Sequence, residues 1–194
     1  MEENRQNLEQ RMDRIIEWVK ACDNKASILL SIDALIITIL LAGDYFMNGI
    51  RTTISTVISE DYSSVTFSGT TAVVCLIVSI ICLLVSLYYC LKVVGAKTEE
   101  SQTGASGVHK ESLIHFHHIS KLSFEDFVAQ MTTEDEDKYL KDLYSQIYIN
   151  AVRCNEKFND YNAAVNAIRI AIPFALGYIV FITIFLATII PVLN

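Results

Sequence analysis

The chain has 194 residues, a formal net charge of −7 and a hydrophobic fraction of 52%. Its mean hydropathy of +0.37 is high for a water-soluble protein. The length allows one domain or one small membrane bundle, and the acidic balance argues against binding to a nucleic-acid duplex.

The N-terminal segment, residues 1–25, carries charges throughout, which excludes a secretory signal peptide. An apolar seam runs along it at alternating spacings of four and three residues: Leu8, Met12, Ile15, Val19 and Cys22. This spacing predicts an amphipathic helix. No Gly or Pro separates it from the apolar run that follows, so we expect one helix to continue into that run.

Three apolar runs follow, at residues 26–43, 69–91 and 170–193. The second and third contain no charged residue. A membrane core of roughly 30 Å needs about 20 helical residues, and a soluble core helix is rarely apolar on every face over such a length. The sequence therefore predicts three transmembrane helices.

The distribution of basic residues predicts the orientation. Residues 1–25 hold five Lys or Arg, the loop 44–68 holds one, and the segment 92–169 holds nine. Positively charged segments stay in the cytoplasm. We therefore expect the N-terminus and residues 92–169 in the cytoplasm, and the loop 44–68 and the C-terminus outside.

The first apolar run contains a carboxylate, Asp33, which costs roughly 3 kcal/mol or more inside a membrane. Asp33 lies eight residues inward from Lys25, and the same count from Lys92 and Arg169 reaches Leu84 and Gly177. The polar residues near these levels are Ser86 and Tyr178, which we expect to donate hydrogen bonds to Asp33. Three roles are open for Asp33: a structural clasp between helices, a pore-facing or proton-relay carboxylate, and a shallower position reached by water or headgroups.

The same run carries a second polar feature, a stripe of small residues. Its members are Asn24, Ser27, Ser31, Ala34, Thr38 and Ala42. Such stripes let helices approach closely in lipid. Asp33 points about 200° away from Ser31 around the helix. If the stripe packs inside one subunit, Asp33 faces another subunit or a pore, and we expect a homo-oligomer with Thr38 among its intramembrane polar residues.

The segment 92–169 is expected to be helical after a polar linker at 97–112. Residues 113–131 predict an apolar turn and then a helix with Ser123 as its N-cap and Asp126 three residues later. Thr132 or Thr133 is expected to cap the last helix, which then runs into the third apolar run. The fold class is thus an all-α membrane protein with three transmembrane helices and a cytoplasmic helical stalk.

The sequence shows little sign of catalysis. All four histidines lie within ten residues, at His109, His115, His117 and His118, but no acids stand at fixed spacing to complete a metal site. No catalytic triad, phosphate-binding loop or HExxH motif is present. We expect no metal, no cofactor and no enzymatic activity.

Three blocks of the sequence resemble a known family. WVKACDNKASILLSIDALIITIL, HFHHISKLSFEDFVAQM and DLYSQIYINAVRCNEKFNDYNAAVNAI are similar, in order and in spacing around the apolar runs, to blocks of the Pycsar membrane effector family. Together they cover about half of the chain. The resemblance implies a bacterial antiphage effector of the inner membrane, whose cognate cyclase or nucleotidyltransferase makes a cyclic or oligomeric nucleotide messenger.

The resemblance also implies a ligand site and a mode of action. The residues of the matching blocks that would meet the messenger are His117, His118, Lys121, Arg153, Asn155 and Lys157. The implied action is an oligomeric ion channel or pore that disrupts the membrane and ends growth of the infected cell. The alternative is a non-conducting membrane scaffold or adaptor whose stalk binds a partner protein.

Overall fold

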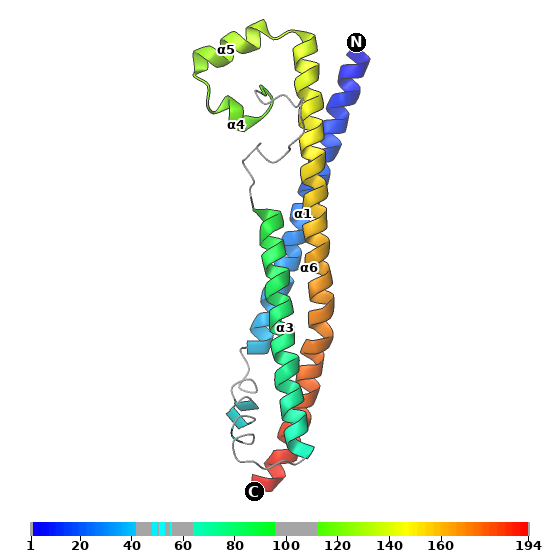
Figure 1. The fold of residues 1–194 in the computed structure, drawn as a ribbon, viewed down its shortest axis with the longest axis vertical. Helices are drawn as coiled ribbons and strands as arrows, with labels where there is room; N and C mark the ends of the chain where they lie inside the picture. The colour runs from blue at the N-terminus through cyan, green and yellow to red at the C-terminus, as the bar shows by residue number, and fades with distance from the viewer. Residues whose placement is uncertain are drawn as a thin grey trace. The chain divides into compact units, whose positions relative to one another are not determined.

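The computed structural model describes residues 2–41, 48–49, 51–52, 55, 64–95 and 112–193. The elements with assigned bounds are all helices (Figure 1): α1 (Glu2–Leu41), α3 (Ser64–Val94), α4 (Phe116–Ile119), α5 (Phe124–Thr133) and α6 (Glu136–Leu193). Three of them, α1, α3 and α6, are long and apolar enough to cross a membrane. The prediction of an all-α membrane protein with three spanning helices is confirmed.

The chain divides into two compact units. The first, which we call the polar unit, comprises Met1–Lys25 and Val93–Asn159. The second, the apolar unit, comprises Ala26–Lys92 and Asp160–Asn194. The predicted loop 44–68 and linker 97–112 fall mostly outside the described residues.

Two helices contribute residues to both units. α1 is a single helix of 40 residues, as the absence of Gly and Pro predicts. α6 is a single helix of 58 residues that passes through Pro173 and Pro191 without ending. Proline removes one backbone donor but does not end a helix whose neighbours are held by packing. The expectation that both amphipathic segments continue into apolar runs is confirmed.

The short helices of the polar unit show which residues act as caps. Ser123 is the N-cap of α5, and its hydroxyl accepts a hydrogen bond from the backbone N–H of Asp126 at 3.1 Å, as predicted. The predicted Thr cap of the last helix is wrong, because Thr132 and Thr133 are still part of α5. The Asp135 carboxylate accepts from the Lys138 backbone N–H at 2.8 Å and caps α6 instead.

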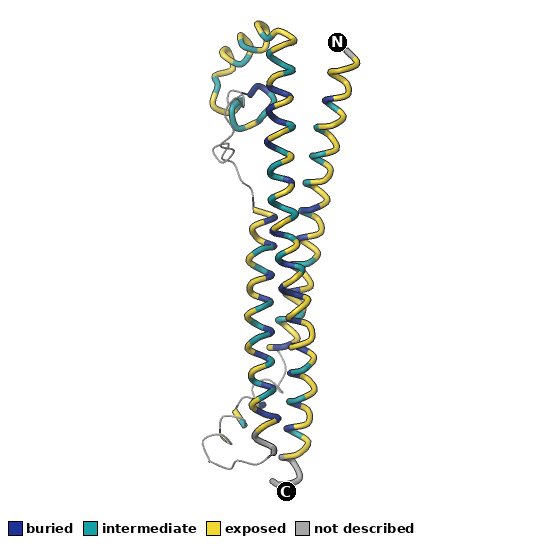
Figure 2. Tube along the Cα trace, turned by 45° about the vertical axis from the view of Figure 1, so that its right-hand side comes forward, coloured by how far each residue is buried: buried dark blue, intermediate teal, exposed yellow. Residues whose placement is uncertain are grey.

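The apolar unit is built from the end of α1, most of α3 and the end of α6, which lie side by side in Figures 1 and 2. Its core contains Leu40, Leu83, Ile182 and Phe185, with alanines at several close contacts. Gly69 is required beside Phe185, since a Cβ at this position would lie 2.7 Å from the aromatic ring. Such small residues allow close helix approach, which drives association in lipid.

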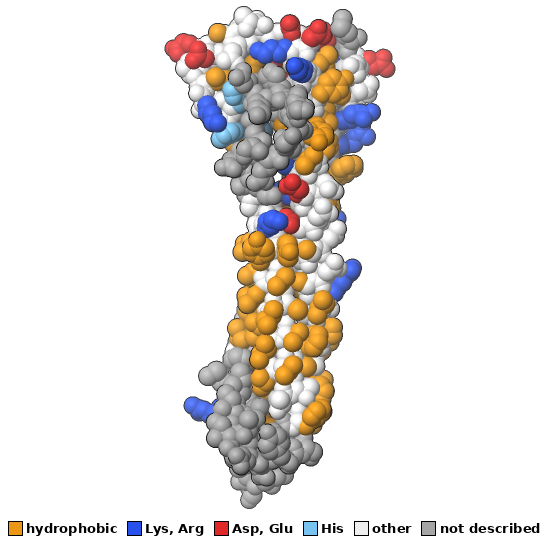
Figure 3. All heavy atoms as spheres, in the orientation of Figure 1, with side chains coloured by type: hydrophobic (Ala, Val, Ile, Leu, Met, Phe, Trp, Pro, Cys, Tyr) orange, Lys and Arg blue, Asp and Glu red, His pale blue; other side chains and the backbone are white. Residues whose placement is uncertain are grey.

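The outward faces of this unit are also apolar. Large hydrophobic side chains such as Ile28, Leu35, Ile77, Leu84 and Leu176 are exposed. Figure 3 shows hydrophobic side chains spread over the visible surface of these helices. A surface of this kind is stable against lipid and unfavourable against water. The chain is therefore a membrane protein.

Candidate functional site

Asp33 lies at the centre of a buried polar site in the apolar unit. Its side chain and that of Ser86 on α3 are fully buried. The Ser86 hydroxyl donates to Asp33 Oδ2 at 2.6 Å, joining α1 to α3. Cys90, one turn further along α3 than Ser86, is also fully buried. The expectation that Ser86 donates to Asp33 is confirmed, and the geometry is that of a clasp between helices.

Tyr178 does not join this hydrogen bond. Its side chain on α6 is buried, but its hydroxyl has no hydrogen-bond partner among the described residues. The other Asp33 oxygen, Oδ1, also lacks a partner there. The expectation that Tyr178 donates to Asp33 is therefore wrong. Counting residues gives the height of a side chain in a helix bundle but not the direction in which it points.

The small-residue stripe and Asp33 lie on the opposite faces from those expected. Ser27, Ser31, Ala34 and Thr38 are exposed, whereas Asp33 is fully buried. The hydroxyls of Ser31 and Thr38 bond to carbonyls of their own helix, at 3.0 and 2.8 Å. Asp33 therefore packs inside the chain, and the stripe lies on its surface.

The physical reason is the heptad seam of α1. Continuing the spacing of four and three residues beyond Cys22 reaches Ala26, Leu29, Asp33, Ile36 and Leu40. All five are buried or half-buried. Asp33 occupies a core position because it belongs to the seam that packs α1 throughout its length.

Two ion pairs hold further helices together. In the polar unit, Lys157 Nζ lies 2.5 Å from the Asp23 carboxylate and joins α6 to α1. In the apolar unit, Lys92 Nζ lies 2.7 Å from the mostly buried Asp160 carboxylate and joins α3 to α6. Lys157, which the resemblance assigns to the ligand, is thus part of an internal ion pair.

The histidine-rich segment is tied to α6 through one buried carboxylate. Asp142 is 1% exposed, and its Oδ2 accepts from the Ser112 hydroxyl and the Leu113 backbone N–H, both at 2.9 Å. The Ser112 hydroxyl in turn accepts from the backbone N–H groups of Ile114 and His115, both at 3.1 Å. This network positions the short helix α4, which carries His117 and His118.

The residues assigned to the ligand by resemblance are only partly brought together. His117 and His118 lie half-buried on α4, and Lys121 is exposed just after it. On α6, Arg153 and Lys157 are one turn apart and share a face, but Asn155 points about 200° away from Arg153. Asn155 therefore lies on a different side of α6 from the two cations.

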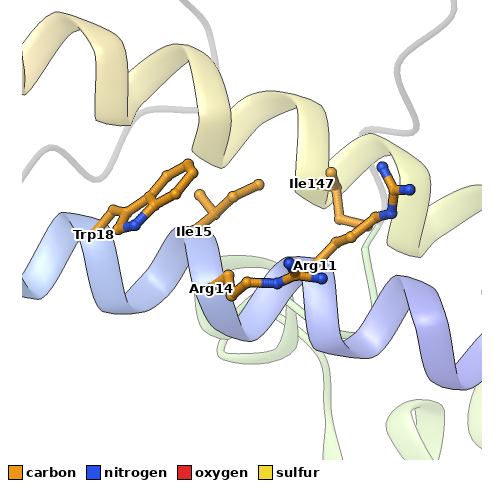
Figure 4. Close-up of a pocket in the computed structure, with 5 residues that line it drawn as sticks. All are labelled: Arg11, Arg14, Ile15, Trp18 and Ile147. Carbon is orange, nitrogen blue, oxygen red and sulfur yellow. The ribbon is translucent and has the colours of Figure 1, made fainter.

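A groove in the polar unit was not predicted from the sequence. It has a volume of about 370 Å³ and is lined by Arg11, Arg14, Ile15 and Trp18 of α1 and by Ile147 of α6. Figure 4 shows Arg11 beside Ile147, Arg14 lying along α1, and Trp18 further along the same helix. The spacing 11, 14, 15 and 18 places Arg11, Arg14 and Trp18 on the helix face next to Ile15 of the apolar seam.

Comparison with known proteins identifies the family of this chain. Residues 7–187 match the profile of the PycTM domain, described as the Pycsar effector protein domain. The chain belongs to the Pycsar effector family. It is 30% identical over 166 residues to the Pycsar effector protein GmPycTM of Gulbenkiania mobilis, covering 81% of this chain and 82% of that protein. No solved structure matches the chain significantly. The family resemblance of the three sequence blocks is confirmed.

Proposed function

We propose that this protein is an antiphage membrane effector that responds to a nucleotide messenger by forming an ion-conducting homo-oligomeric pore, and that it has no catalytic activity. Membership of the Pycsar effector family supports the defence role. A cognate cyclase or nucleotidyltransferase would supply the messenger. The protein would lie in the bacterial inner membrane with its polar unit in the cytoplasm, as the distribution of basic residues predicts.

The continuity of α1 and α6 is the observation that carries this proposal. Each helix has one segment in the polar unit and one in the apolar unit. A ligand that changes how these helices pack in the polar unit therefore acts on the same helices that cross the membrane. Shifts and rotations of packed helices are a common way of coupling a binding site to a distant change.

The pore requires several copies of the chain. In the described part of the apolar unit, the helices pack around a core of side chains such as Leu76, Leu83 and Phe185. A core filled in this way offers no path for ions within one chain. The exposed small-residue stripe of α1, which includes Ser31 and Ala34, supports close contact with a second copy.

Ion flux from liposomes tests the proposal. The purified full chain is reconstituted, and flux is measured with and without a panel of cyclic and linear nucleotides, with protein-free liposomes as the control. We expect at least one nucleotide to switch flux on or off, and the direction of the change gives the sign of gating. Absence of flux under every condition, from protein shown to be helical and inserted, would refute the pore and favour the non-conducting scaffold.

A further inference from the structure

The groove of the polar unit combines two kinds of chemistry on one helix face. Arg11 and Arg14 supply guanidinium groups one turn apart, and Trp18 follows one turn after Arg14 (Figure 4). The Trp18 side chain is 59% exposed although it is a large aromatic group in the polar unit. Ile15 and Ile147 supply the apolar part of the lining. We call these five residues the Arg–Trp groove.

The two guanidinium groups are suited to an anion. The chain as a whole is acidic, with 22 Asp and Glu against 15 Lys and Arg. Arg14 uses its Nε to donate to the Gln10 carbonyl at 3.3 Å. In the part of the chain that the structure describes, neither Arg11 nor Arg14 forms an ion pair with a carboxylate. Their terminal nitrogens can therefore take the oxygens of a phosphate in the forked geometry that guanidinium groups favour.

The indole and the apolar lining are suited to a planar ring. An exposed tryptophan face binds nucleobases by stacking, with little preference for the base. Arg14 and Trp18 lie four residues apart, about 6 Å along the helix axis. A phosphate at Arg14 and a ring on the indole are thus separated on the scale of one nucleotide, and Arg11, one turn beyond Arg14, would contact the phosphate from its far side. The volume of about 370 Å³ is near the lower end of the range for small-molecule sites, which favours a mononucleotide over an oligonucleotide.

We propose that the Arg–Trp groove binds a mononucleotide, with its phosphate on Arg11 and Arg14 and its base on Trp18. This inference rests on the proposed function, because it names the place where the messenger acts. It differs from the assignment by resemblance, which puts the messenger on residues including Arg153 and Lys157. The groove is formed by α1 and α6, so a ligand in it contacts both helices that continue into the apolar unit.

The experiment uses the fluorescence of Trp18, which is the single tryptophan of the chain. The full chain, purified in detergent without phospholipid, is titrated with cyclic and linear mononucleotides of each base. Excitation at the red edge of the indole band avoids absorption by the bases. We expect one or more nucleotides to quench Trp18 saturably, and calorimetry to give the same dissociation constant.

Variants then locate the site. Arg11→Gln and Arg14→Gln should each weaken binding about tenfold or more, as expected for the loss of a charge-assisted contact. Trp18→Leu, followed by calorimetry, should weaken binding by a similar factor. Lys20→Gln is the matched control, because it removes an exposed cation from the same helix outside the groove, and it should leave binding unchanged. Circular dichroism of each variant establishes that the helices are intact.

Three results would overturn the inference. Nucleotide binding that leaves Trp18 fluorescence unchanged and is insensitive to Arg11→Gln and Arg14→Gln would place the site elsewhere while the proposed function stands. A response of Trp18 to phosphatidylglycerol vesicles, but to no nucleotide, would assign the groove to a phospholipid headgroup. Absence of nucleotide binding together with absence of nucleotide-dependent flux would refute both this inference and the proposed function.

Discussion

The hydrogen bond between Ser86 and Asp33 is a fully buried polar contact that joins α1 to α3 inside the apolar unit. A carboxyl group in this setting has no water to replace a lost partner. Ser86→Ala leaves Asp33 buried without its one described donor, and we expect a loss of about 1–3 kcal/mol in unfolding free energy. Denaturation in detergent micelles, followed by circular dichroism, measures this loss.

Ser31→Ala is the control for this substitution. Among the residues that the structure describes, the exposed Ser31 hydroxyl bonds only to the Ser27 carbonyl of its own helix, so its removal should change stability by less than about 0.5 kcal/mol. Equal effects of the two substitutions would show that the buried clasp does not stabilise the fold. Asp33→Asn should stay closer to the wild type than Ser86→Ala, because an amide can still bond to Ser86.

Two glycines of the apolar unit provide a second test at this scale. A Cβ at Gly69 would lie 2.7 Å from the buried Phe185 ring, whereas a Cβ at Gly177 would lie 3.4 Å from Cys75 Sγ. We expect Gly69→Ala to destabilise the protein by about 1–3 kcal/mol through overpacking. Gly177→Ala should be neutral or slightly stabilising in the same denaturation assay, because alanine favours the helix. The reverse order would contradict the packing of α3 against α6.

At this scale the sequence predicts some contacts and not others. The level of Ser86 with Asp33 follows from counting residues along two apolar runs, because the helical rise is fixed. Tyr178 stands at a matching level by the same count but does not bond to Asp33. Its direction depends on how α6 is rotated in the bundle, and that is set by packing against the other helices.

Among the elements, α6 begins with a cap that the sequence pattern placed incorrectly. The Asp135 carboxylate satisfies the Lys138 backbone N–H, and Asp135→Ala should cost about 0.5–2 kcal/mol of unfolding free energy. Thr133→Ala is the matched control, because the Thr133 hydroxyl bonds to carbonyls at the end of α5 and caps nothing. Urea denaturation compares the two variants. A larger loss of unfolding free energy for Thr133→Ala than for Asp135→Ala would support the threonine as the cap of α6.

The length and continuity of the elements could be predicted, but the buried face of α1 beyond Cys22 was predicted incorrectly. Apolar runs and the lack of Gly or Pro are sufficient to predict that α1 is unbroken. α1 carries two candidate packing stripes, the small residues around Ser31 and the heptad seam through Asp33. The seam runs from Leu8 to Cys22, and its continuation at the same spacing predicts that Asp33 is buried. The seam is hard to follow beyond Cys22 because Asp33 occupies one of its positions, and carboxylates are rarely found in a core.

At the scale of the whole molecule, the proposed homo-oligomer would have its contact between copies at the exposed small-residue stripe. In a background without the native cysteines, Ala34→Cys should form disulfide-linked dimers in oxidised membranes, because Ala34 is small and exposed on the stripe. Ile32→Cys is the control, because Ile32 is also exposed but points about 200° away around α1. Non-reducing gel electrophoresis detects the dimers. Equal cross-linking at both positions would show that α1 makes no specific contact between copies.

Asp33 and the small-residue stripe lie on opposite faces of α1, which links their exposure in any rotation of the helix. α1 contains no Gly or Pro between Glu2 and Leu41, so a twist applied at one end is carried along its hydrogen-bonded turns. Half a revolution about its axis would withdraw Asp33 from Ser86 and turn it to the direction that Ser31 now takes. In the same motion the small hydroxyl side chains would enter the seam. Because Asp33 and the small-residue stripe lie on opposite sides of one unbroken helix, a rotation of α1 that exposed the carboxyl group would also bury the stripe.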